Sequence, residues 1–140
     1  MTTEDGVRNS RKRLIIVDDH PEMISIVTQL LRDHYDIIAT SGTGGEGLKA
    51  IACLEPDCVV LDISMPDLSG IEVAQRLKAI RSRVKIIFLT VHEDPDYVKE
   101  ALTAGANAYV LKSQLESDLV TALKQTLAGN FFISPSINMN

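Results

Sequence analysis

The chain has 140 residues, 45% of them hydrophobic and 24% charged, and a formal net charge of −5. These values predict one ordinary globular domain, and the acidic balance argues against direct binding to nucleic acid. No apolar run approaches the ~20 residues of a membrane span and the N-terminus lacks the apolar core of a signal peptide, so we expect a cytoplasmic protein with no membrane partner.

Apolar periodicity predicts five strands that alternate with five helices. A polar tail, residues 1–13, precedes the first strand. The strands are expected at 14–17, 37–39, 58–61, 84–89 and 108–111. The helices are expected after Pro21, after the glycines of 42–47, after Ser69-Gly70, between Pro95 and Gly105, and over 115–128. Strict alternation predicts an α/β fold, a doubly wound parallel sheet with helices on both faces.

The two cysteines and the last residues give weaker signals. Cys53 and Cys58 have no partner at metal-ligand spacing, so we expect two reduced and mostly buried thiols. Residues 130–140 leave the periodic pattern and predict either a linker or a tail that docks Phe131 or Phe132.

One stretch, DCVVLDISMPDLSG at 57–70, places a lone carboxylate at the end of a buried strand. The strand ends at Asp62, and a loop with Pro66 and Gly70 follows. The first strand likewise runs into Asp18-Asp19, the fourth into Thr90 and the fifth into Lys112. Because parallel strands bring their carboxyl ends to one edge of the sheet, these side chains should lie together.

Three acids at one edge should repel one another. Two like charges ~4 Å apart repel by about 4 kcal/mol at an effective dielectric near 20, so a bound cation should relieve the strain. Carboxylate oxygens with room for water and phosphate suit Mg²⁺.

The whole pattern resembles the receiver domain of bacterial two-component response regulators, over residues 14–129. The motifs DDHP, LKS and FFISPS are similar to the NarL/FixJ-like subfamily. The resemblance implies a flavodoxin-like (βα)5 fold with strand order 2-1-3-4-5 and a Mg²⁺-dependent phosphoryl transfer from a sensor histidine kinase. Such a domain is a signalling phospho-acceptor that assists its own phosphorylation and dephosphorylation; it is not an enzyme in the usual sense.

The resemblance also assigns roles to single residues. Asp62 is the phospho-acceptor, and Thr90 and Lys112 contact the phosphoryl group. The metal ligands are Asp19, Asp62 and the Ser64 backbone carbonyl, with Asp18 acting through water. Thr90 and Tyr109 form the switch: phosphate should draw the Thr90 hydroxyl inward and allow Tyr109 to turn inward. His20 and His92 are interpreted as loop residues that shape access.

One position departs from the family pattern. Ser113 follows Lys112, where the family usually has proline, often after a cis bond. A cis bond before another residue costs about 2.5–4 kcal/mol, so the local backbone geometry stays open.

The subfamily's output is a helix-turn-helix DNA-binding domain, which these 140 residues do not contain. We expect the switch to control such a domain, with DNA as a partner only through it, and a phosphorylation-dependent homodimer through a face that includes 115–128. The alternative is a stand-alone receiver that acts through protein contacts.

The sequence also suggests two alternative functions. Gly42, Gly44 and Gly47 spell G-x-G-x-x-G, which predicts a dinucleotide-binding module, but the motif follows the second strand and Glu46 would face the pyrophosphate. A phosphatase of the haloacid-dehalogenase type also forms an aspartyl phosphate, but it needs D-x-D after the first strand, where this chain has adjacent acids.

Overall fold

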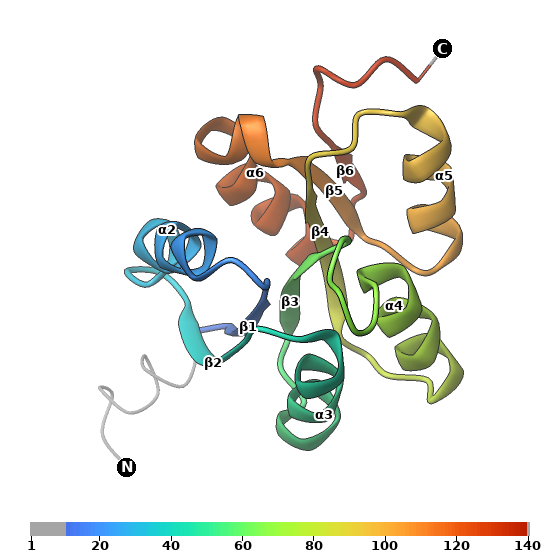
Figure 1. Cartoon of the computed structure of the whole chain (residues 1–140). Coiled ribbons are helices and arrows are strands. Elements are labelled where there is room, and N and C mark those ends of the chain that lie inside the picture. The colour runs from blue at the N-terminus through green and yellow to red at the C-terminus, as the bar shows by residue number, and fades with distance from the viewer. Residues whose placement is uncertain (1–10, 140) are drawn as a thin grey trace.

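The computed structural model describes residues 11–139, which form one parallel sheet flanked by helices (Figure 1). Within this range the strand order is β2-β1-β3-β4-β5-β6, and every neighbouring pair is parallel. The strands are β1 Arg13–Val17, β2 Asp36–Ser41, β3 Cys58–Asp62, β4 Lys85–Thr90, β5 Ala108–Leu111 and β6 Phe132–Ile133. The flavodoxin-like order 2-1-3-4-5 is confirmed, with one short strand added at the edge.

Among residues 11–139, five α-helices cover the two faces of the sheet (Figure 1). They are α2 Pro21–Leu31, α3 Gly44–Leu54, α4 Gly70–Ala79, α5 Pro95–Thr103 and α6 Leu115–Leu127, and a 3-10 turn, η1 Lys112–Gln114, precedes the last one. Side chains of Thr43, Ser69 and Asp94 cap α3, α4 and α5 by accepting a backbone N–H of the first turn. Proline at the first position of α2 and of α5 starts those helices where the sequence predicts.

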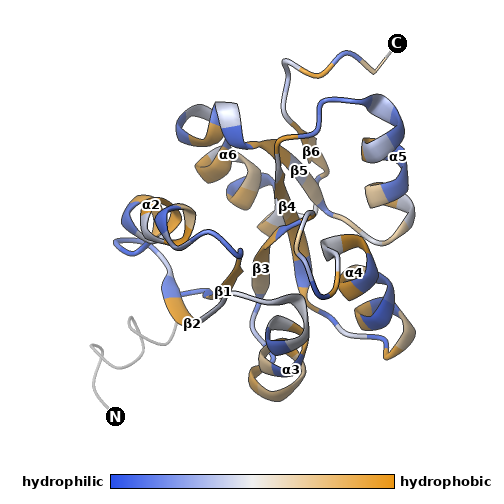
Figure 2. Ribbon diagram, viewed as in Figure 1, coloured by the Kyte–Doolittle hydropathy of each residue, from blue (hydrophilic) through white to orange (hydrophobic). Residues whose placement is uncertain are grey.

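Alternate residues of each strand enter two separate cores, because successive side chains of a strand point to opposite faces. Val59 and Leu61 pack with α3, α4 and α5, whereas Cys58 and Val60 pack with α2 and α6. All five residues of β3 are buried, as the unbroken apolar run predicts for a central strand. In Figure 2 the central strands are mostly hydrophobic, and the helices around them carry both hydrophobic and hydrophilic residues.

The segment after α6 returns to the sheet instead of leaving it. Ile133 pairs with Tyr109, and the Ser134 hydroxyl accepts the backbone N–H of Leu111 at 3.0 Å. Ile137 is buried in the same core as Tyr109. The tail therefore docks as expected through Phe132, which pairs with Ala108 and packs partly buried against the core beside α2 and α6, and also through Ser134 and Ile137. Phe131, in contrast, is 72% exposed.

Three smaller expectations have mixed outcomes. Cys58 is buried and free, as expected, but Cys53 is free and exposed, because it lies on the outer side of α3. Of the expected tail 1–13, residues 1–10 lie outside the described range. No helix among the described residues is both long and apolar enough to cross a membrane.

Candidate functional site

The carboxyl ends of four strands bring the expected side chains together. Asp18 follows β1, Asp62 closes β3, Thr90 closes β4 and Lys112 follows β5. The carboxylates of Asp18 and Asp62 are 2% and 3% exposed, and Thr90 is 1% exposed. Polar groups this buried need partners, since burial without them is unfavourable.

Lys112 lies between the two buried acids. Its Nζ is 3.1 Å from Asp18 Oδ2 and 3.4 Å from Asp62 Oδ2. Neither Oδ2 atom accepts a hydrogen bond from any described residue. One ammonium thus faces two carboxylates whose outer oxygens have no other partner.

The electrostatics of Asp62 reflect this shortage of positive charge. Burial and the neighbouring Asp18 carboxylate raise the pKa of Asp62 to about 6, although Lys112 and the backbone N–H of Ser64 act in the opposite direction. An acid strained in this way gains from a bound cation.

Ligand atoms of Asp18, Asp19, His20 and Asp62 all lie within 4.8 Å of one another. The side chain of Asp19 is 27% exposed, so the cluster is open to solvent on one side. The carboxylate oxygens, among them the buried Oδ2 atoms of Asp18 and Asp62, form a set of ligand atoms that fits a divalent cation.

The loop after β3 is fixed by close backbone packing. Gly70 donates its N–H to the carbonyl of Ile63 at 2.8 Å, and a Cβ at Gly70 would collide with the carbonyl oxygen of Asp62. Ser64 is exposed, and its backbone N–H donates to Asp62 Oδ1 at 3.2 Å. Glycine at position 70 therefore allows helix α4 to start directly against the end of β3.

The same loop is tied to α3 by Asp67. Its Oδ1 accepts the N–H of Gly44 at 3.0 Å, and its Oδ2 accepts the N–H of Gly45 at 2.9 Å. These two bonds lower the pKa of Asp67. The N–H groups that a pyrophosphate would need already donate to the Asp67 carboxylate of the same chain. This contact explains the glycine-rich motif without a dinucleotide.

Thr90 and Tyr109 both contact the backbone of His92. The N–H of His92 donates to Thr90 Oγ1 at 3.1 Å, and the Tyr109 hydroxyl donates to the His92 carbonyl at 2.8 Å. Burial raises the pKa of Tyr109 to about 12. Tyr109 is fully buried, so it already has the inward orientation that we expected to follow phosphorylation.

The His92 side chain extends these contacts. Its Nε2 lies 3.0 Å from Ser64 Oγ, and its ring stacks on Tyr97 with centroids 4.2 Å apart. His92 thus touches the loop after β3, the end of β4 and helix α5. Sequence reasoning placed His92 beside the site but missed these contacts, as it missed Asp67, because the partners are distant in the chain.

The backbone after Lys112 is resolved by the structure. The described residues contain no cis peptide bond, so Lys112 and Ser113 are joined in trans. Lys112 opens the 3-10 turn η1, and the chain then enters α6.

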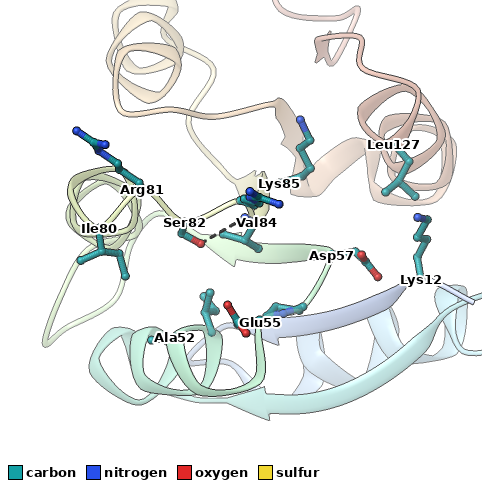
Figure 3. A pocket seen from close by; sticks show the side chains of 13 residues that line it. Lys12, Ala52, Glu55, Asp57, Ile80, Arg81, Ser82, Val84, Lys85 and Leu127 are labelled. Carbon is teal, nitrogen blue, oxygen red and sulfur yellow. Dashed lines mark hydrogen bonds between the residues drawn. The ribbon is translucent and has the colours of Figure 1, made fainter. Parts of the chain in front are cut away.

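A separate cavity of about 630 Å³ lies at the opposite edge of the sheet (Figure 3). Its wall includes Lys12, Glu55, Asp57, Arg81 and Lys85, a mixture of both charges. None of the acids or the lysine of the site contributes to it, so it has no part in the chemistry described here.

Comparisons with known proteins show the family of the chain. A family profile described as "Response regulator receiver domain" matches residues 14–124. The response regulator GacA of Pseudomonas viridiflava is 32% identical over 127 residues, 89% of this chain and 59% of GacA. The nitrate/nitrite response regulator NarL of Escherichia coli K12 is 32% identical over 128 residues, 89% of this chain and 58% of NarL.

A LuxR-family two-component response regulator from Aurantimonas has a crystal structure with a TM-score of 0.86 and 32% identity; the match covers 91% of this chain and 93% of that one. The chain spans about three fifths of the length of the curated relatives named above. On sequence, fold and site together, the chain belongs to the response regulator receiver family, with relatives of the NarL/LuxR type.

Proposed function

We propose that Asp62 accepts a phosphoryl group from a sensor histidine kinase and that Mg²⁺ assists the transfer. The observation that carries the proposal is the Asp62 carboxylate itself. It is buried at the end of β3, and the only partner of its Oδ2 among the described residues is Lys112 Nζ, 3.4 Å away. An acid held so near an ammonium and a second acid serves little structural purpose and suits charged chemistry.

Each step has a residue for it. An oxygen of Asp62 attacks phosphorus, a P–O bond forms, and the P–N bond to the donor histidine breaks as the imidazole leaves. Lys112, already paired with Asp62, is placed to neutralise a phosphoryl oxygen, and the Thr90 hydroxyl to donate to another. A bound Mg²⁺ would supply positive charge for the remaining oxygens; Asp19, Asp62 and the Ser64 carbonyl would hold it, with Asp18 acting through water.

The output is a shift between two arrangements of the Thr90 loop. When the Thr90 hydroxyl moves to donate to the phosphoryl group, its hydrogen bond with the His92 N–H should weaken. The His92 carbonyl, which accepts from the Tyr109 hydroxyl, should then shift as well. One hydrogen bond to a charged group contributes about 1.5–3 kcal/mol, a modest bias. Both arrangements should therefore coexist before phosphorylation, with Tyr109 inward in one of them.

In this proposal the domain is a signalling phospho-acceptor, and its phosphorylation regulates the activity of its partners. The longer curated relatives include transcriptional regulators, which supports control of a DNA-binding output domain. RcsB, which shares the fold at 23% identity, has been solved as dimers bound to DNA. We extend to this chain a phosphorylation-dependent homodimer through a face that includes α6.

A phosphorylation assay tests the proposal. Acetyl phosphate with Mg²⁺ should add one phosphoryl group to the wild type and none to Asp62→Asn, as intact-protein mass spectrometry would detect. Asp33→Asn, which changes an exposed acid outside the site, is the matched control. Labelling that persists in Asp62→Asn but disappears in Asp19→Asn would place the nucleophile elsewhere.

A further inference from the structure

His20 lies in the acid cluster as a fourth potential ligand. Its ring Nδ1 is 3.0 Å from Asp18 Oδ1 and 3.1 Å from Asp19 Oδ1. The ring is 59% exposed, so it borders the solvent side of the cluster. The imidazole therefore faces the same space as the carboxylates that the proposed function assigns to a metal ion.

Two features of the cluster point to a ligand in this space. The Oδ2 atoms of Asp18 and Asp62 are buried and have only the Lys112 ammonium, at 3.1 and 3.4 Å, as a partner among the described residues. In addition, Asp19 Oδ1 is buried without a hydrogen-bond partner in that part of the chain, although it lies near the His20 ring. The cluster thus has more acceptor atoms than the protein's own donors satisfy.

The spacing of His20 suits coordination. Two adjacent ligands of an octahedral ion with bonds of about 2.1 Å lie about 3.0 Å apart. The distance from Nδ1 to Asp19 Oδ1, 3.1 Å, matches this separation.

The His20 side chain is not needed to start helix α2. His20 is the N-cap residue of α2, but its side chain makes no capping hydrogen bond. The start of α2 is fixed by Pro21 and by the backbone of His20, whose carbonyl accepts the N–H groups of Met23 and Ile24. A substitution at this side chain should leave the helix intact.

We propose that His20 is a metal ligand through Nδ1, so that the cluster binds a first-row transition ion with mixed nitrogen and oxygen ligands more tightly than Mg²⁺. Imidazole suits ions such as Co²⁺, Ni²⁺ and Zn²⁺, whereas Mg²⁺ prefers oxygen. The inference rests on the proposed function, because it takes the acid cluster as the metal site. It adds a residue and a metal preference to that site.

Calorimetric titration with Co²⁺ and with Mg²⁺ tests the inference. His20→Gln keeps a polar side chain of similar reach, and should weaken Co²⁺ binding at least about tenfold while changing Mg²⁺ binding by less than that. His34→Gln, which removes an exposed imidazole just after α2, should change neither affinity. X-ray absorption at the cobalt edge should show the outer-shell scattering of a bound imidazole in the wild type and lose it in His20→Gln.

Equal Co²⁺ affinities in wild type and His20→Gln, or a cobalt spectrum without imidazole, would overturn the inference. Mg²⁺ binding and phosphorylation of Asp62 would then stand unaffected. If neither Mg²⁺ nor Co²⁺ bound the wild type, the acid cluster would be no metal site, and the metal in the proposed function would fall as well.

Discussion

The phenol of Tyr109 donates a hydrogen bond to the backbone carbonyl of His92 across 2.8 Å. The two residues belong to different segments, β5 and the loop after β4, and the bond joins the interior of the sheet to the loop beside the acid cluster. The N–H of the same residue, His92, donates to the Thr90 hydroxyl. The backbone of His92 therefore contacts both the Thr90 hydroxyl beside the acid cluster and the buried Tyr109.

Removing the phenol should loosen that loop. Tyr109→Phe leaves the His92 carbonyl without its donor, so we expect a loss of about 1–2 kcal/mol in the free energy of unfolding and faster amide exchange over 91–94. Tyr35→Phe is the control, because Tyr35 is only partly buried and its hydroxyl makes no hydrogen bond to another residue of 11–139. Urea denaturation and hydrogen exchange would measure both effects; equal behaviour of the two variants would separate Tyr109 from the loop.

Stability without metal should depend on pH through Asp62. Burial and Asp18 raise its pKa from 3.8 to about 6, so the folded state holds the proton more tightly than the unfolded state. The resulting stabilisation is full below pH 3.8 and is lost as pH rises through about 6. Between pH 5 and 7 the free energy of unfolding should fall by about 1 kcal/mol.

Two variants separate the sources of this pH dependence. Asp62→Asn should remove the part that comes from Asp62. The pKa of His20 is also raised, by its hydrogen bond to Asp18 and by the charge of Asp19, and acts in the same direction, so His20→Gln should remove a smaller part. Urea midpoints at the two pH values give the comparison, and an unchanged slope in Asp62→Asn would show that Asp62 is not the strained group.

Asp67 should position the loop that carries Ser64. Asp67→Ala leaves the amides of Gly44 and Gly45 without their acceptor, which should cost about 0.5–2 kcal/mol, as the loss of a helix cap does. The freed loop should also slow phosphorylation by acetyl phosphate. Asp33→Ala, an exposed acid after α2, is the control for charge. A variant as stable and as rapidly phosphorylated as wild type would show that the loop holds itself.

The tail should be part of the folded domain. Ser134→Ala deprives the buried N–H of Leu111 of its acceptor and should lower the free energy of unfolding by about 1–3 kcal/mol. Ser136→Ala, two residues later and exposed, should change it by less than about 0.5 kcal/mol. If the two variants unfold at the same urea concentration, the tail is only a loosely attached linker.

The parts that the sequence predicts are those that depend on local pattern. Buried parallel strands are apolar throughout, so β3 and β5 are visible as short runs, and a polar residue that ends such a run, as Asp62 does, stands out. The carboxyl ends of parallel strands meet at one edge of the sheet, so the sequence alone predicts that Lys112 lies near Asp62.

The rest depends on contacts between distant segments. A strand of two residues has no periodicity to detect, so the sequence does not predict β6; it forms because the edge of β5 is available for pairing. Asp67 reaches Gly44 across 23 positions of sequence, and nothing local marks it. Alternation assigns Tyr109 to a face, but its inward rotamer depends on the carbonyl of His92, which only the folded loop provides.

The central claim is that Asp62 carries the phosphoryl group, and its position can be read directly. An acyl phosphate is reduced by borohydride to an alcohol, which converts a phosphorylated aspartate into homoserine. Wild type treated with acetyl phosphate and Mg²⁺, then with borohydride, and mapped by peptide mass spectrometry should contain homoserine at position 62 and aspartate at positions 18, 19 and 67. Homoserine at another position, or aspartate retained at position 62 in protein shown to carry phosphate, would contradict the account.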